Sequence, residues 1–392
     1  MNVTNDIRYV GVNDHDIDLF EGQYVVENGM AYNSYVIVDD KIAVLDTVDA
    51  RFRHEWLDNV AEVLGGRKPD YLIVQHMEPD HSANIMSFIS TYPDVKVAAS
   101  AKAFAMMGQF FGDDLSDRQV VVSEGSVLDL GKHKLNFIAA PMVHWPETMM
   151  TFDETDGVLF SGDGFGCFGT VDGGFLDTRI NVDKYWGEMV RYYSNIVGKY
   201  GSPVQKALQK LGGLPITTIC STHGPVWTEN IAKVIGIYDR LSRYDADEGV
   251  VIAYGSMYGN TEQMAEAIAE ELSAQGIKNI VMHNVSKSDP SYIIADIFRY
   301  KGLIIGSPTY SNQIFPEVES LLSKILVREL KGRYLGYFGS FTWAGAAVKR
   351  MAEFAEKSKF ELVEMKQAMK DLTYTQCENL ARAMADRLKK DR

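Results

Sequence analysis

The distribution of apolar residues changes near residue 246, and this change limits the folds that the chain can adopt. Before that point, short apolar or alternating runs typical of strands recur, with turn-forming residues between many of them. After it, apolar strands alternate with amphipathic helices, beginning with the strand Val250–Tyr254. This alternation predicts an open, doubly wound parallel sheet covered on both faces. The polar run Arg243–Gly249 separates the two patterns, so we predict one domain over residues 1–246 and another over residues 247–392.

Length and composition agree with two globular domains and exclude several classes of protein. The 392 residues are 46% hydrophobic and 23% charged, which excludes a disordered chain. The net charge of −14 argues against nucleic acid or an anionic membrane as a partner. Cys167, Cys220 and Cys377 form no CxxC pair, so this sequence encodes neither a zinc ribbon nor a rubredoxin-type iron site. We find no signal peptide and no apolar run long enough to span a membrane, and we therefore expect a cytoplasmic protein.

Possible metal ligands gather after four of the predicted strands. The run 75–82, which follows the apolar strand Tyr71–Val74, holds four of them, and three more each follow another strand. The candidates are His76, Glu78, Asp80, His81, His144, Asp163 and His223. Acidic and imidazole side chains packed this closely repel one another or lose hydration unless a cation lies between them, so we predict a metal site. Seven ligands fit two metals that share a carboxylate, and nitrogen–oxygen ligation suits iron, manganese or zinc.

Three loops of the second half have the composition of a phosphate and cofactor site. Gly255–Thr261 joins a strand to a helix, where free N–H groups favour an anion. No lysine follows its glycines, so the polyphosphate loop GxxxxGK[ST] is absent and a single phosphate is the better match. The loops Gly306–Asn312 and Gly339–Gly345 follow the next strands of the sheet, and all three loops would meet at its switch point. Tyr310 and Trp343 offer flat faces to a planar ring.

The metal run resembles the His-x-His-x-Asp-His motif of metallo-β-lactamase-fold proteins, with His144, Asp163 and His223 at the later metal-binding positions. The chain departs from that motif at Glu78, where a hard anionic oxygen in place of histidine favours iron over zinc. With a flavodoxin-like domain following, the whole chain resembles the flavodiiron proteins. The resemblance implies an αββα metallo-β-lactamase-like sandwich followed by a flavodoxin-like doubly wound parallel sheet.

The resemblance also implies how the seven ligands divide between two iron ions. One iron is expected to bind His76, Glu78 and His144, and the other Asp80, His81 and His223, with Asp163 as the bridge. Family members differ in whether the histidine at position 81 contacts iron.

Three further residues are candidates for a role beside the irons. Asp46 matches an acidic position of the superfamily that usually supports a ligand, with a hairpin cap as the alternative. Tyr193 is our candidate catalytic residue, and Trp145 follows His144 directly. Either aromatic residue could instead belong to the core.

The first of the three loops resembles the flavodoxin phosphate loop, Ser/Thr-x-Thr/Tyr-Gly-Asn-Thr. By that resemblance, the FMN phosphate would bind Ser256, Met257, Tyr258, Gly259, Asn260 and Thr261. The ring and ribityl chain would be surrounded by Pro308, Thr309, Tyr310, Ser311, Asn312, Ser340, Phe341, Thr342, Trp343, Ala344 and Gly345.

As a flavodiiron protein, the chain would be an oxidoreductase that reduces oxygen to water, nitric oxide to nitrous oxide, or both. Two alternatives come from the residues alone. One is a dizinc hydrolase of the metallo-β-lactamase fold joined to a flavodoxin-like domain, against which Glu78 argues. The other is an electron carrier whose first domain is only a scaffold, against which the complete ligand set argues.

The expected partners are an electron donor and further copies of the chain. Without a CxxC pair, the chain needs an external donor, which by resemblance is a rubredoxin. The segment Lys331–Arg392 has 13 Lys/Arg against 8 Asp/Glu, a local +5 on a remainder of −19, so an acidic donor is expected to dock there. We also expect a head-to-tail homodimer, or a tetramer of such dimers, because a two-fold contact can bring each flavin to the irons of the other chain.

Overall fold

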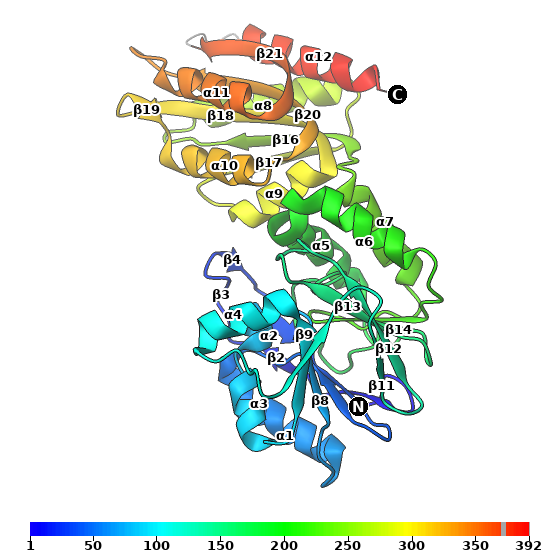
Figure 1. Cartoon of the computed structure of the whole chain (residues 1–392). Helices are drawn as coiled ribbons and strands as arrows, with labels where there is room; N and C mark the ends of the chain where they lie inside the picture. Colours follow the sequence, from blue (N-terminus) through cyan, green and yellow to red (C-terminus); the bar gives the residue numbers. More distant parts are fainter. Residues whose placement is uncertain (370–373, 392) are drawn as a thin grey trace. The chain divides into compact units, whose positions relative to one another are not determined.

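The computed structural model describes residues 1–369 and 374–391, whose contacts divide into two compact units (Figure 1). The first unit comprises Met1–Tyr193 and Tyr200–Asp239, and the second comprises Ser194–Lys199 and Arg240–Arg392. The domain boundary at residue 246 stays a prediction. Among the described helices, none has the length and apolarity needed to cross a membrane.

Two sheets form the first unit. One has the order β1-β6-β7-β8-β9-β10 and the other β11-β12-β13-β14-β15. The strands of the first sheet are β1 (Ile7–Tyr9), β6 (Tyr35–Ile37), β7 (Ala43–Leu45), β8 (Tyr71–Val74), β9 (Lys96–Ser100) and β10 (Gln119–Val122). Those of the second are β11 (Val127–Asp129), β12 (Lys134–Ala139), β13 (Met149–Asp153), β14 (Val158–Gly162) and β15 (Thr218–Ser221).

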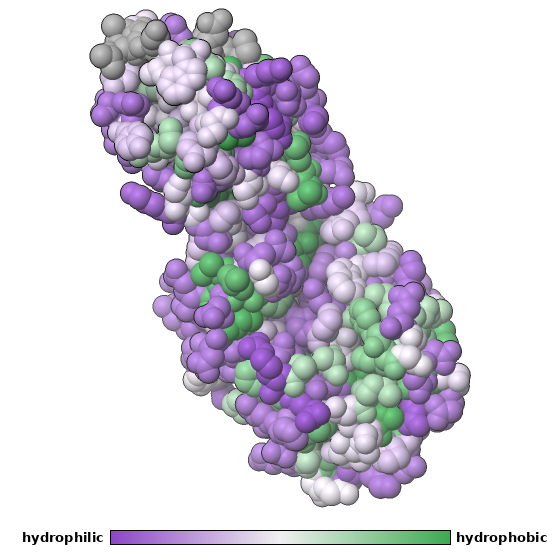
Figure 2. Space-filling model, turned by 90° about the vertical axis from the view of Figure 1, so that its left-hand side faces the viewer, coloured by the Kyte–Doolittle hydropathy of each residue, from purple (hydrophilic) through white to green (hydrophobic). Residues whose placement is uncertain are grey.

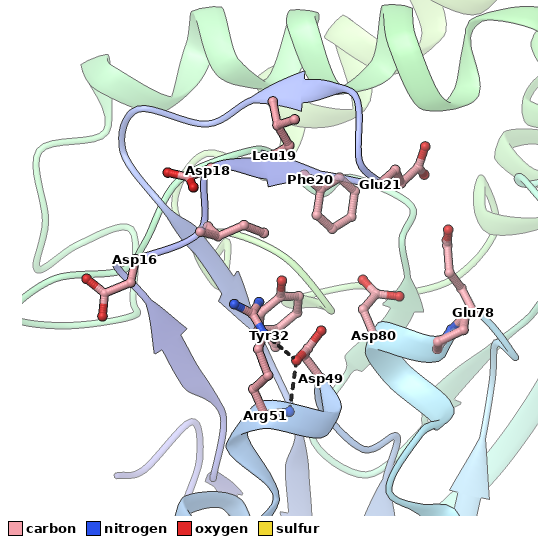
Figure 3. Close-up of a pocket in the computed structure, with 12 residues that line it drawn as sticks. Asp16, Asp18, Leu19, Phe20, Glu21, Tyr32, Asp49, Arg51, Glu78 and Asp80 are labelled. Atoms are coloured by element: carbon pink, nitrogen blue, oxygen red, sulfur yellow. Dashed lines mark hydrogen bonds and ion pairs between the residues drawn. The ribbon is translucent and has the colours of Figure 1, made fainter.

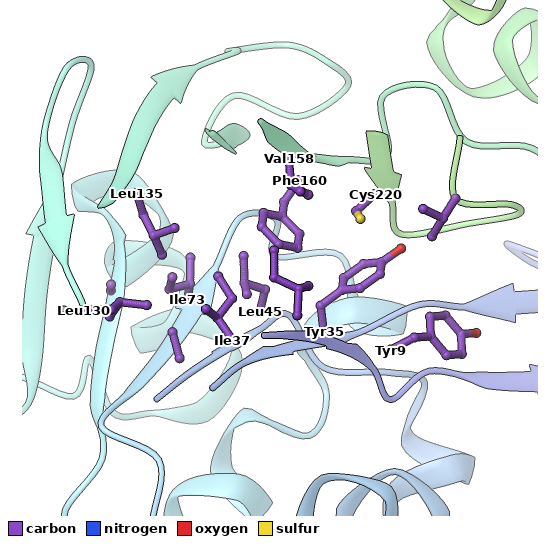
Figure 4. Packing of buried hydrophobic residues seen from close by; sticks show 14 of the residues in the cluster. Tyr9, Tyr35, Ile37, Leu45, Ile73, Leu130, Leu135, Val158, Phe160 and Cys220 are labelled. Carbon is purple, nitrogen blue, oxygen red and sulfur yellow. The ribbon is translucent and has the colours of Figure 1, made fainter. Parts of the chain in front are cut away.

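Alternate strand residues from both sheets build one shared core (Figure 4). Tyr35 and Ile37 of β6 belong to it while Val36 between them does not, because successive side chains of a strand point to opposite faces. Tyr35 meets Phe160 of β14 edge to face, with ring centroids 5.4 Å apart. The two sheets therefore pack face to face across this apolar layer.

Helices complete the first unit. They are α1 (Arg53–Leu64), α2 (Pro79–Ser82), α3 (Ile85–Thr91), α4 (Ala101–Phe111), α5 (Asp183–Tyr192), α6 (Gly201–Leu211) and α7 (Ile231–Ser242), of which α7 continues past Asp239 into the second unit. Trp56 of α1 packs on Phe88 of α3, and Lys210 of α6 donates to the carbonyl oxygen of Ala139 in β12 at 2.7 Å. With helices beside each sheet, the predicted αββα sandwich is confirmed.

The second unit has a parallel sheet in the order β17-β16-β18-β20-β21, with the short β19 antiparallel to β18. The strands are β16 (Asp247–Tyr254), β17 (Ile280–Asn284), β18 (Tyr300–Tyr310), β19 (Gln313–Ile314), β20 (Lys331–Ser340) and β21 (Lys359–Met369). The helices are α8 (Asn260–Ala274), α9 (Pro290–Arg299), α10 (Pro316–Val327), α11 (Ala346–Lys357) and α12 (Thr375–Lys389). Counted by parallel strand, the order is 2-1-3-4-5, which is the flavodoxin-like topology that the alternation predicted.

Helices cover the sheet of the second unit on both faces. Ile252 and Ile304 share an apolar cluster with Ile268 of α8 and Leu380 of α12, while α9 contacts β16 and β18. The switch point of this topology lies between β16 and β18, whose following loops are two of the predicted cofactor loops.

On the molecular face drawn in Figure 2, hydrophilic side chains predominate and apolar ones form separate patches.

Candidate metal centre and cofactor loops

The fold brings all seven predicted metal ligands together. His76 and Glu78 follow β8, and Asp80 and His81 lie in α2. The other three, His144, Asp163 and His223, follow β12, β14 and β15. Their ligand atoms form two groups, each within 4.8 Å: His76, Glu78, His144 and Asp163 in one, and Asp80, His81 and His223 in the other.

In the first group, two imidazole nitrogens face two carboxylates. Nε2 of His76 and Nε2 of His144 lie 3.3 and 3.1 Å from Oε2 of Glu78. Asp163 Oδ2 lies 3.2 Å from His144 Nε2 and 3.6 Å from His76 Nε2. The four side chains thus aim their donor atoms at one small volume.

The second group lies on the other side of Asp163. Nε2 of His81 and Nε2 of His223 are each 3.2 Å from Asp80 Oδ2, and they are 3.0 Å from each other. Asp163 turns its second oxygen toward this group, with Oδ1 at 2.9 Å from His81 Nε2. Asp163 therefore offers one oxygen to each group, which is the arrangement of a bridging ligand.

The charges of the buried ligands fit cations between them. Burial lowers the pKa of His81, but the charges of Asp80 and Asp163 outweigh it and raise that pKa to about 9. Burial also opposes a charge on His144, whose contacts with Asp163 and Glu78 nevertheless raise its pKa to about 9. Both oxygens of Asp80 are buried and accept no hydrogen bond within the described part of the chain. Carboxylates that stabilise positive charge so strongly, one of them with unused acceptors, fit a pair of metal ions.

Other residues hold the ligands in place through hydrogen bonds to the outer histidine nitrogens or to the neighbouring backbone. Asp46 accepts hydrogen bonds from the backbone N–H and the side-chain amide of Gln75, at 2.8 and 2.9 Å, and so holds the residue before His76. His223 donates from Nδ1 to the carbonyl oxygen of Ala31 at 2.8 Å, which leaves Nε2 for the cluster. Sequence reasoning missed Glu147, which accepts a hydrogen bond from Nδ1 of His76 at 2.8 Å. The sequence did contain a signal for this residue, because Glu147 is a carboxylate three residues after the ligand His144.

Aromatic rings enclose the ligands. Tyr192 packs on His223 at 5.6 Å between ring centroids, and Trp145 meets His76 edge to face at 5.1 Å. The Tyr192 hydroxyl is buried and has no hydrogen-bond partner among the residues described. Tyr193, the predicted catalytic residue, packs edge to face on Tyr238 at 5.0 Å, and its role stays a prediction.

A pocket of about 530 Å³ opens beside the cluster and is lined by one ligand of each group, Glu78 and Asp80 (Figure 3). Residues 16–21, in the loop after β2 (Val12–Asp14) and in and just after β3 (Leu19–Phe20), line one side, and Glu78 and Asp80 line the other. Phe20 lies above Asp80 and packs edge to face on His223. A small, uncharged molecule therefore has an open route to the cluster.

The predicted phosphate loop begins α8 at the carboxyl end of β16. Gly259 is the residue before the helix, with φ of +92°, a conformation that side-chain-bearing residues rarely adopt. Its N–H donates to Ser256 Oγ at 3.2 Å, and the Thr261 and Ser340 hydroxyls are 2.8 Å apart. Hydroxyls and the first N–H groups of α8 thus meet at one point, as a phosphate site requires.

A second pocket, of about 400 Å³, lies against this loop. The predicted cofactor residues that line it are Met257, Tyr258, Asn260, Pro308, Thr309, Ser340, Phe341, Thr342, Trp343 and Ala344. Gln263, Met264 and Tyr374 line it as well and were not predicted. The other predicted cofactor residues, Ser256, Gly259, Thr261, Tyr310, Ser311, Asn312 and Gly345, are not part of this lining. Tyr258 and Trp343 are 92% and 84% exposed, so both present open ring faces.

Known protein families match both halves of the chain. Residues 30–224 match the family described as ODP family beta lactamase, and residues 252–378 match flavodoxin. The anaerobic nitric oxide reductase flavorubredoxin of Vibrio vulnificus is 32% identical over 372 residues, which cover 92% of this chain and 74% of the relative. The rubredoxin oxygen:oxidoreductase of Desulfovibrio gigas superposes with a TM-score of 0.94 at 29% identity, covering 100% of this chain and 98% of the other. The flavodiiron protein of Giardia intestinalis gives 0.92 at 26% identity, covering 99% and 96%.

Proposed function

Because the chain belongs to the flavodiiron proteins, we propose that it reduces nitric oxide to nitrous oxide, oxygen to water, or both, at a diiron centre. It is an oxidoreductase whose cofactors are FMN and two non-haem iron ions. The observation that carries the proposal is Asp163, which turns one oxygen to each of two ligand groups. A carboxylate that offers one oxygen to each of two ligand groups can bridge two metal ions, whereas a single metal would use only one of the groups.

The two ligand groups give the assignment of the irons. We assign His76, Glu78 and His144 to the first iron and Asp80, His81 and His223 to the second, with Asp163 common to both. Glu78 supports iron over zinc because it supplies a hard oxygen. When bound, two ferrous ions supply two electrons and the reduced flavin two more, which together match the four needed to reduce oxygen to water.

The surrounding residues orient the ligands and cover part of the cluster. Ala31 holds the tautomer of His223, and Asp46 holds the backbone ahead of His76. The rings of Phe20 and Tyr192 cover His223, whereas the pocket that reaches Glu78 and Asp80 is lined mainly by charged side chains. We propose the Tyr192 hydroxyl, which has no partner among the described residues, as a hydrogen-bond donor to groups bound at the cluster.

The FMN site is assigned to the three loops of the second unit. The phosphate would lie on the N–H groups at the start of α8 with Ser256, Asn260 and Thr261, and the ring beside Trp343. The absence of lysine in this loop matches one phosphate rather than three.

Electron supply and assembly follow from the same assignment. We propose a rubredoxin-type donor that docks on the basic segment 331–392, and a head-to-tail dimer in which the flavin of one subunit serves the irons of the other. The dimer is tested by mixing an Asp163→Asn chain with one disrupted at Gly259 and Thr261. Recovered activity in exchanged dimers supports transfer between chains, and no recovery in demonstrated mixed dimers rules it out.

The function itself is tested by anaerobic turnover of the fully reduced protein with each gas in turn. The proposal expects loss of oxygen without peroxide, formation of nitrous oxide from nitric oxide, or both. Two zincs per chain with esterase activity would instead support the dizinc hydrolase. A protein that exchanges electrons but turns over neither gas would be an electron carrier.

A further inference from the structure

Glu147 contacts the ring nitrogen of His76 that faces away from the other ligands. Its Oε1 accepts one hydrogen bond from His76 Nδ1 at 2.8 Å and another from the backbone N–H of Met77 at 2.9 Å. The side chains of His76 and Glu147 are both fully buried. Because the same oxygen already accepts the N–H of Met77, Glu147 acts as an acceptor toward His76, and Nδ1 of His76 is the donor.

We propose that Glu147 is the positioning residue of the first iron: it fixes His76 in the tautomer whose Nε2 lone pair faces Glu78 and Asp163. The inference rests on the proposed function, because it takes iron as the ion that His76 binds. A histidine binds a metal through an unprotonated nitrogen, and a carboxylate on its other nitrogen holds the ring and makes it a stronger ligand.

The second ligand group has no counterpart of Glu147 among the described residues, so the proposal predicts different effects on the two irons. In the second ligand group, the outer nitrogen of His223 donates to the neutral carbonyl of Ala31. The outer nitrogen of His81 has no partner among the described residues. In the described part of the chain neither of these histidines has a carboxylate on its outer nitrogen, so loss of Glu147 weakens the first iron and leaves the second unaffected.

Two features of the site decide which substitutions are informative. Oε1 of Glu147 receives two N–H donors, so an amide introduced by Glu147→Gln must keep its oxygen toward Met77 and His76. Its NH₂ group then takes the place of Oε2, which accepts no hydrogen bond in the described part of the chain. Glu147 also lines a cavity of about 120 Å³ with Ser100 and Lys102, which has room for water. Glu147→Gln thus removes the charge alone, whereas Glu147→Leu removes the charge and the tautomer lock.

Asp177 provides a matched control in the same unit. It is a buried carboxylate that accepts backbone N–H groups, from Thr228 at 3.0 Å and Asn230 at 2.9 Å, and it touches no ligand histidine. Asp177→Leu therefore imitates the structural part of Glu147→Leu. Any effect that the two variants share is a loss of stability rather than of ligand positioning.

The experiment measures release of ferrous iron from the full-length protein to a chelator without oxygen, alongside thermal unfolding. For Glu147→Leu we expect one of the two irons to leave roughly ten- to a hundredfold faster and the other at the wild-type rate. For Glu147→Gln the same iron leaves faster by a smaller factor, so the variant remains informative even if Glu147→Leu fails to fold.

Two results overturn the proposal. One is release of both irons at wild-type rates from Glu147→Gln and Glu147→Leu. The other is equal acceleration of both irons that matches Asp177→Leu at the same loss of thermal stability. A wild-type protein that holds no pair of irons would instead refute the proposed function, so the two failures are distinguishable.

Discussion

Replacing Asp163 by asparagine removes the one ligand that both groups share. The carboxylate has Oδ2 at 3.2 Å from His144 Nε2 and Oδ1 at 2.9 Å from His81 Nε2. Thr222 Oγ1 also donates to Oδ1 at 2.6 Å, an interaction that the asparagine oxygen can keep. Asp163→Asn therefore preserves shape and removes a negative charge from the centre of the buried cluster.

The size of the effect follows from the charge that is lost. Two unit charges about 4 Å apart interact by roughly 4 kcal/mol at an effective dielectric of about 20, so a divalent ion loses about 8 kcal/mol. If water and the remaining ligands restore half of this, each iron binds about a thousandfold more weakly. His223→Asn removes a ligand of the second group only, and the same reasoning leaves the first iron bound.

The assay is iron content per chain after anaerobic desalting, with FMN content as the measure of a folded second unit. We expect about two irons in the wild type, close to none in Asp163→Asn and about one in His223→Asn. Thr222→Val keeps the carboxylate but loses its hydrogen bond, and should fall between wild type and Asp163→Asn in affinity for both irons. An Asp163→Asn protein that keeps one tightly bound iron would refute the bridging role.

Three further predictions concern other parts of the chain. Asn260→Asp places a negative charge at the start of α8 beside the FMN phosphate, and should weaken FMN binding by roughly tenfold or more in a fluorescence titration; unchanged affinity counts against the phosphate assignment. Reduction by a rubredoxin-type donor should slow as salt increases, because a basic segment attracts an acidic donor through screened charges; a rate independent of ionic strength argues against docking there. Burial lowers the pKa of His133, but Asp153 at 3.0 Å and Asp6 at 3.2 Å outweigh it and raise that pKa, so the charged histidine stabilises the fold. Relative to His133→Gln, the wild type should be more stable by about 2 kcal/mol below pH 6.5, with the advantage lost as the pH rises through the raised pKa; a difference independent of pH would contradict this.

The ligand set was predictable because every ligand follows a strand with a strong sequence signal, although Asp80 and His81 lie in the short helix α2. The apolar run Tyr71–Val74 forms β8, and the ligands of the run 75–82 follow it directly. These strands belong to two sheets, β8 to the first and β12, β14 and β15 to the second, so the signals marked the segments while their meeting depends on how the two sheets pack. The same reasoning placed the loop Gly255–Thr261 between β16 and α8.

Support residues were harder to predict, since their roles depend on contacts between distant segments. Glu147 reaches His76 across 71 positions of sequence, and no periodicity encodes that contact. Tyr192 and Tyr193 are neighbours whose side chains point about 100° apart on a helix, so choosing between them needs the helix phase. α5 ends at Tyr192, and a π-helical turn starts at Tyr193, which changes that phase. Sequence alone therefore finds the tyrosine pair but not which member faces His223.

The central claim is that two irons and one flavin act together on a gas, and electron counting tests it most directly. The measurement is the amount of oxygen consumed, and of peroxide formed, when fully reduced protein with two ferrous ions and reduced FMN per chain meets limiting oxygen. The account predicts four electrons delivered per oxygen, no peroxide, and loss of this stoichiometry in Asp163→Asn. Two electrons per oxygen with peroxide as the product, unchanged in Asp163→Asn, would mean that the flavin alone reacts and would contradict the account.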